Sequence, residues 1–220
     1  MDRISVSLVS RLGTWQDVRD SARNTVWKKS LGEDKEVSSE FKRKMLMSEH
    51  SPIRLLQFKV RMEIPYWVSV HLVRHKLGVE HFVSTQRDDR QVTGQVKLDA
   101  AKDIFAGLIN HYLFSLFGKE VPRKYKMQGE PVIHEMLVNA QSLIFISRKR
   151  LCYLASPETT ATVQKIKNLL SMEEPELAAV MVPECIYRGF CPEEPCKSRY
   201  AWTPKFLRDL LKYRSTIGRR

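Results

Sequence analysis

Leu56-Gln57-Phe58-Lys59-Val60-Arg61-Met62-Glu63-Ile64 is the stretch that decides the fold. Apolar and polar side chains alternate strictly along it, which predicts a β-strand with one buried and one solvent-facing side. Pro65 follows, and proline breaks a strand but suits the first turn of a helix, so a helix is predicted over 66–75. In such a helix His71, Arg74 and His75 project from one face.

Shorter patterns on both sides of this strand predict the remaining elements. Caps, breakers and apolar periodicity predict strands at 4–9 and 132–138, a strand or loop edge at 94–97, and helices at 15–27, 38–48, 99–118, 140–153, 157–170 and from 204 onward. Asn139 and Arg150 are almost in phase across three turns of the predicted 140–153 helix.

The chain has 220 residues, of which 43% are hydrophobic and 28% charged, with no repeat and no linker-like segment. This is ordinary globular usage, so we expect one domain over 1–220, with 197–220 as a basic C-terminal helical extension.

The sequence has a formal net charge of +12, which favours polyanionic partners such as nucleotides, phosphorylated cofactors or nucleic acid. No apolar run reaches the roughly 18 residues that span a bilayer, and the N-terminus lacks the apolar segment of a secretory signal. We therefore expect a cytoplasmic protein without membrane association. The four cysteines are expected to be free thiols.

The residues 71–90 concentrate imidazoles, guanidiniums, a hydroxyl and an amide directly after the apolar strand. A face with His71, Arg74 and His75 suits phosphate or the charged parts of a flavin, because guanidinium and imidazole donate to anionic oxygens. The alternative is a solvated surface helix.

Other chemistries fit the spacing less well. Ser84 and His81 lack the glycine elbow and the orienting carboxylate of a hydrolase, so Ser84 is better placed as a ligand-binding hydroxyl. No HExxH or paired CxxC pattern is present, and we predict no metal site, although Cys185, Cys191 and Cys196 leave a three-thiolate zinc site as an alternative. No Walker loop and no GxGxxG are present.

The sequence resembles the flavin-dependent thymidylate synthases. Their signature, Arg-His-Arg followed by seven residues and Ser, is matched by Arg74-His75-Lys76 and Ser84. Further matches follow in the family's order: 49–52 before the first long strand, 121–123 at the phosphate-contacting loop, 139–142 with Arg150 eleven residues on, and 185–193.

The resemblance implies an α+β fold, an antiparallel sheet packed with helices, in a homotetramer with active sites at subunit junctions. It implies FAD as cofactor, NADPH and methylenetetrahydrofolate as co-substrates, and methylation of dUMP to dTMP. Carried over residue by residue, it assigns FAD contacts to Ser51, Arg74, His75, Lys76, His81 and Asn139. It assigns dUMP contacts to His71, Ser84, Gln86, Arg87, Arg123 and Arg150, with Ser84 and Arg150 in the catalytic centre, Arg123 at the phosphate and Arg150 at the uracil.

Several positions depart from the family pattern. Lys76 replaces the second signature arginine, His81-Phe82 replaces an Asn-Glu pair, and Gln86 replaces an arginine, with Arg87 and Arg90 as possible substitutes. These departures motivate a second hypothesis, the same FAD-binding fold acting on another pyrimidine nucleotide or in another one-carbon reaction. A third is a non-catalytic nucleic-acid-binding protein, which the charge favours but for which no stacking platform is seen.

Overall fold

The computed structural model describes residues 4–32, 34–86, 112, 128–193 and 196–216. The elements in these ranges are, in chain order, β1 Ser5–Leu12, α1 Trp15–Asn24, α2 Ser39–Met47, η1 Ser51–Leu55, β2 Gln57–Pro65, α3 Tyr66–Leu72, β3 Val79–Val83, β4 Pro131–Asn139, α5 Ala140–Arg150, α6 Pro157–Glu173, α7 Pro175–Val180, α8 Glu184–Arg188, η4 Tyr200–Trp202 and α9 Pro204–Thr216.

The described strands form one antiparallel sheet in the order β1-β2-β4-β3. The predicted strand, β2, is one of the two inner strands, and it pairs with the other, β4, from Gln57 opposite Asn139 to Pro65 opposite Pro131. Its alternation holds in space: Phe58, Val60, Met62 and Ile64 are at most 1% exposed, while the residues between them are half-buried or exposed. The α+β fold with an antiparallel sheet is therefore confirmed.

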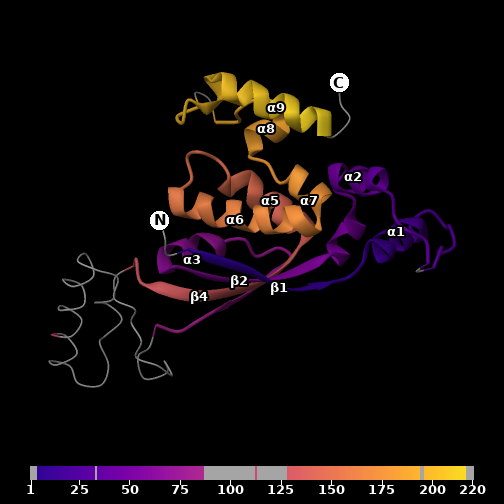
Figure 1. The fold of residues 1–220 in the computed structure, drawn as a ribbon, viewed down its shortest axis with the longest axis horizontal. Helices are drawn as coiled ribbons and strands as arrows, with labels where there is room; N and C mark the ends of the chain where they lie inside the picture. The colour runs from indigo at the N-terminus through magenta and orange to yellow at the C-terminus, as the bar shows by residue number, and fades with distance from the viewer. Residues whose placement is uncertain (1–3, 33, 87–111, 113–127, 194–195, 217–220) are drawn as a thin grey trace.

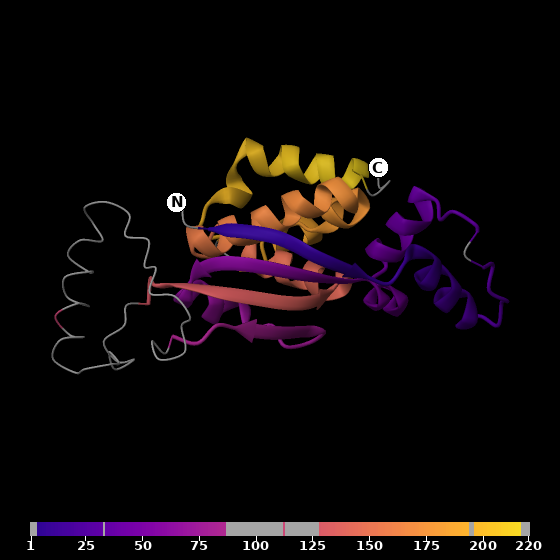
Figure 2. The same cartoon turned by 60° about the horizontal axis from the view of Figure 1, so that its bottom comes forward.

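Helices cover the buried face of the sheet. Figures 1 and 2 show α5, α6 and α7 against this face, with α8 and α9 forming a further layer outside them. The large core lies between sheet and helices, and a smaller apolar cluster lies beneath α9, containing Val182, Cys185, Ile186, Tyr200, Phe206, Leu210 and Tyr213. The single domain stays a prediction.

Side-chain caps explain where several helices begin. Thr14, Ser38, Asn139 and Ser156 each accept a backbone N–H of the following first turn. Asn139 is also the last residue of β4, so one residue ends the strand and starts α5.

The structure corrects several predicted boundaries. The predicted 66–75 helix ends at Leu72, the 15–27 helix at Asn24 and the 140–153 helix at Arg150, whereas the 157–170 helix continues to Glu173. Because α3 stops early, His71, Arg74 and His75 do not share one helix face. The strand β3 was not predicted. The predicted elements at 94–97 and, apart from Tyr112, 99–118 lie outside the described residues.

Among the described residues, no helix is both long and apolar enough to cross a membrane.

Candidate active site

Arg150 and His75 form the centre of the candidate site. Arg150 is the last residue of α5, and its Nε donates to His75 Nε2 at 3.0 Å. Its Nη2 donates to the backbone carbonyl of His71 at 2.8 Å. These two contacts fix the guanidinium against the end of α3 and the segment that follows it, and they occupy two of its five N–H groups.

The contact with Arg150 explains why α3 ends before the signature residues. In a continuing helix the His71 carbonyl would accept the amide of His75 four residues on. Instead the His75 amide donates to Leu72 O at 2.9 Å, and the His71 carbonyl accepts from Arg150. The signature therefore lies on a turn that α5 holds in place.

His75 is buried, with 9% of its surface exposed. Burial lowers its pKa to about 4, and the positive charge of Arg150 and the proximity of His81 act in the same direction. The ring is thus neutral at pH 7, and because Nε2 accepts from Arg150, its hydrogen lies on Nδ1. A neutral His75 with its hydrogen on Nδ1 can act there as a hydrogen-bond donor.

His71 has a partner that the sequence did not indicate. Its Nδ1 lies 3.0 Å from the hydroxyl of Thr159, and that hydroxyl also accepts from Ser156 at 2.7 Å. Thr159 donates to His71 when the hydrogen of the neutral imidazole lies on Nε2, and accepts from it when that hydrogen lies on Nδ1. Burial, followed by the charges of Arg150 and Arg74, lowers the pKa of His71. Thr159 and Ser156 begin α6, where they read only as helix-capping residues.

Asn139 is engaged within the fold. Its side-chain oxygen accepts the backbone N–H of Ser142 at 2.9 Å, and its own backbone N–H donates to Gly78 O at 3.1 Å. Gly78 has φ +67°, and a Cβ there would lie 2.1 Å from Asn139 Nδ2. This close packing joins the signature turn to the start of α5.

Ser84 lies just beyond β3, opposite β4. Its backbone N–H donates to Ile133 O at 2.8 Å, and its hydroxyl accepts the Ile133 backbone N–H at 3.0 Å, so in this contact the hydroxyl acts as the acceptor and keeps its hydrogen as a donor. Phe82 is 59% exposed and pairs with Glu135 of β4. The Nε2 of Gln86 is buried and has no partner among the described residues.

The remaining predicted FAD contacts differ in exposure. Arg74, Lys76 and Ser51 are exposed, whereas His81 is half-buried, with Nε2 2.8 Å from the carbonyl oxygen of His75. The turn thus presents two cations next to a fixed imidazole. Arg87, Arg90 and Arg123 lie outside the described residues, so their predicted roles stay predictions.

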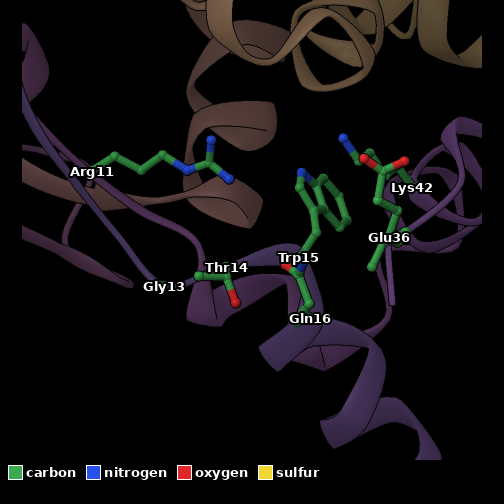
Figure 3. Close-up of a pocket in the computed structure, with 8 residues that line it drawn as sticks. Arg11, Gly13, Thr14, Trp15, Gln16, Glu36 and Lys42 are labelled. Carbon is green, nitrogen blue, oxygen red and sulfur yellow. The ribbon is translucent and has the colours of Figure 1, made fainter. Parts of the chain in front are cut away.

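A cavity of about 630 Å³ lies apart from these residues, at the start of α1 (Figure 3). Arg11, Trp15 and Lys42 are among the residues that line it. The indole of Trp15 donates to buried Glu174 at 2.7 Å, and Arg11 pairs with the same carboxylate. The polar groups of Trp15 and Arg11 are therefore engaged with Glu174 within the fold.

A second cavity, about 440 Å³, lies under α9 between Leu151, Lys167, Val182 and Tyr213, among others. None of the predicted site residues lines either of these two cavities.

All four cysteines are free thiols. Among the described residues, no group of three or more His, Cys, Asp or Glu side chains is arranged to hold a metal ion.

The signature turn, which carries Arg74, His75 and Lys76 between α3 and β3, and the end of α5 together form a site rich in hydrogen-bond donors. Arg150 contacts the ring of His75, and the exposed cations Arg74 and Lys76 are its neighbours in the chain. Burial lowers the pKa of Arg150, and the positive charge of Arg74 is a further cause. A negatively charged ligand beside this guanidinium would therefore stabilise its charged form. Such a site suits an anionic or polarised, oxygen-rich ligand.

Comparisons with known proteins give one informative result. No protein-family model matches the chain, and no curated protein sequence matches it. Among solved structures, the fold is similar to that of a UMP/dUMP methylase, PolB from Streptomyces cacaoi, bound with 5-Br dUMP. The two share 16% sequence identity with a TM-score of 0.59, over 85% of this chain and 95% of that chain. At this identity the likeness shows a common fold.

Proposed function

We propose that this protein is an enzyme that methylates the uracil ring of dUMP, with FAD as cofactor and NADPH and methylenetetrahydrofolate as co-substrates. The observation that carries the proposal is the Arg150–His75 contact, because it joins two sequence segments that independently resemble the flavin-dependent thymidylate synthases. The shared fold with a UMP/dUMP methylase supports the same chemistry.

The residues present suit a flavin nucleotide. Arg74 and Lys76 are exposed cations on one turn, the donor type that binds a pyrophosphate, and His75 is held in a single neutral tautomer beside them. When bound, FAD would supply the hydride transfer that begins with NADPH. The chain's own residues bind and orient the partners.

In the nucleotide site Arg150 has the leading role. Its fixed guanidinium is proposed to donate to a uracil oxygen, where a cation stabilises the negative charge that develops as the ring becomes nucleophilic. Ser84, just beyond β3, is proposed to donate its hydroxyl hydrogen to the nucleotide, since its oxygen accepts from Ile133. No side-chain nucleophile is required, since positioning and electrostatics activate the ring.

The second candidate has the same fold and cofactor with UMP, or another pyrimidine nucleotide, as acceptor. Gln86 favours it, because the buried Nε2 of Gln86 without a partner among the described residues replaces an arginine of the resembled family. An amide can donate to a ribose hydroxyl or a base oxygen as readily as to phosphate.

The homotetramer is likewise a proposal. Phe82 and Ile133, which are 59% and 39% exposed, lie on one face of the sheet, because Phe82 pairs with Glu135 and residues 133 and 135 share a face of β4. Figure 2 shows α5, α6 and α7 on the other face. An exposed aromatic on a sheet face suits a contact with a second copy.

The test is a titration of the purified protein with FAD, followed by visible absorbance, in the wild type, Arg74→Ala/Lys76→Ala and the matched control Lys149→Ala. We expect saturable binding in the wild type and control, and at least about tenfold weaker binding in the double variant, because charge-assisted hydrogen bonds are lost. Equal affinity in all three would contradict the assignment of this turn, and no binding in any would contradict the flavin. The bound protein is then assayed with dUMP and with UMP.

A further inference from the structure

His134 ends a chain of hydrogen bonds that runs from the core of the sheet to the candidate site. It lies on β4 and is 0% exposed, and its Nε2 is 2.9 Å from His81 Nδ1. The two rings meet edge to face, with centroids 5.1 Å apart. His81 Nε2 in turn lies 2.8 Å from the carbonyl oxygen of His75, whose ring accepts from Arg150.

The partners determine where each hydrogen lies. A carbonyl oxygen only accepts, so His81 Nε2 must carry the hydrogen that points to His75. In neutral His81 the other nitrogen, Nδ1, is then an acceptor, and His134 Nε2 must donate to it. His134 Nδ1 is left without a hydrogen, and it is buried without a partner among the described residues. Each ring thus has one tautomer that satisfies the chain.

A doubly protonated His81 ring is disfavoured in this chain of hydrogen bonds. If His81 carried hydrogens on both nitrogens, two donors would face each other unless His134 moved its hydrogen to Nδ1, where no described group accepts it. Burial, with the proximity of His81 as a second cause, lowers the pKa of His134 to about 4. His134 therefore stays neutral near pH 7. The other titratable or charged groups in this chain of hydrogen bonds are His81, His75 and Arg150.

We propose that His134 is a positioning residue that holds His81 in the Nε2–H tautomer and thereby fixes the carbonyl of His75 and the signature turn. The turn carries Arg74, His75 and Lys76 as one short segment between α3 and β3, so a single anchored carbonyl limits the freedom of all three. The effect on turnover rests on the proposed function, whereas the tautomers do not.

The test is nuclear magnetic resonance of protein labelled with ¹⁵N in the histidine rings, recorded at pH 7 without ligands. In the wild type we expect a hydrogen on Nε2 of both His81 and His134 and on Nδ1 of His75. A hydrogen on His134 Nδ1 would overturn the proposal without any variant.

Two substitutions then separate positioning from packing. His134→Gln retains an amide donor for His81, whereas His134→Phe retains a buried ring without one; His50→Phe, at an exposed histidine, is the matched control. We expect His81 to keep one tautomer in the control and in His134→Gln, and to become a mixture in His134→Phe. A single Nε2–H tautomer in His134→Phe would overturn the proposal.

The same variants are assayed for turnover across pH 6–9. We expect His134→Phe to lose at least about tenfold in kcat, with rescue by His134→Gln, as is typical when a group that orients a site residue is removed. Full activity in a His134→Phe protein with mixed tautomers would refute the link to the site. A wild type without turnover would refute the proposed function and leave the tautomer result to decide the positioning role.

Discussion

At the residue scale, Arg150 is the side chain on which most of the site depends. It spans two acceptors, the His75 ring and the His71 carbonyl, which a lysine with its single ammonium could not reach in the same directional way. It explains the end of α3, and after burial it is the next cause of the lowered pKa of His75.

We predict that Arg150→Lys lowers kcat by at least about 100-fold, the usual effect of removing a donor that stabilises developing charge. FAD affinity should fall much less than kcat, because the exposed cations Arg74 and Lys76 of the turn are unchanged and only the support of His75 is lost. Single-turnover kinetics and a flavin titration check this. The adjacent exposed Lys149→Ala is the control, and unchanged turnover in Arg150→Lys would remove Arg150 from the site.

The buried histidines also predict how stability depends on pH. The pKa of His75 and of His134 is about 4 in the folded chain, against an ordinary value of 6.5. Between these values the unfolded chain binds more protons, so folding stability is fully present above about pH 6.5 and falls as the pH drops toward 4. Each ring contributes up to about 3 kcal/mol to this loss.

Urea unfolding at pH 7 and pH 5 measures that loss. His134→Phe should show a smaller decrease than the wild type, because one of the two rings can no longer be protonated in the unfolded state. An equal decrease in both proteins would show that His134 is not held neutral by the fold.

At the element scale, the signature turn depends on its contact with the start of α5. Gly78→Ala should destabilise the fold by about 3 kcal/mol, the sum of a left-handed backbone and a clash with Asn139 and Ser142. Gly32→Ala is the matched control, since Gly32 also has positive φ but nothing within 4 Å of its Cβ position, and should cost about 1 kcal/mol. Chemical denaturation measures both, and equal losses would mean that the turn and α5 are not closely packed.

Elements with strong local patterns could be predicted from the sequence. The alternation in β2 places that strand, and the capping residues Thr14 and Ser38 place the starts of α1 and α2, because these signals act within a few residues. The end of α3 could not be predicted, since a side chain 79 residues away takes over the His71 carbonyl. The strand β3 was missed because only Val79 of its five residues is buried.

The site could be predicted in part. The ordered motifs indicated Arg150 and His75 as functional, but that they contact each other required the structure. His134 had a usable signal, as the one polar residue in the buried phase of the predicted 132–138 strand, next to Val132 and Met136. Thr159 had none, because its position fits an ordinary first turn of a helix.

At the scale of the whole molecule, the described chain has two apolar clusters, and the smaller one attaches α8 and α9 to the outside of the helical layer (Figure 1). Phe206 belongs to the smaller cluster and is 6% exposed, whereas its neighbour Leu207 is 59% exposed. A cluster of this size is expected to open locally at a lower free energy than the sheet.

Phe206→Ala should therefore raise amide hydrogen exchange in 184–216 by at least about tenfold and leave β2 and β4 nearly unchanged. Leu207→Ala should leave both regions unchanged. Exchange followed by mass spectrometry distinguishes the regions, and a uniform increase across the sheet would mean that the two clusters unfold as one unit.

The most direct measurement of the central proposal is the mass of the product formed from dUMP with FAD, NADPH and methylenetetrahydrofolate carrying deuterium in its methylene group. We predict dTMP containing that deuterium, formed only when all of these components are present and at least about 100-fold more slowly with Arg150→Lys. A protein that binds FAD but yields no methylated nucleotide from either dUMP or UMP would contradict the proposal.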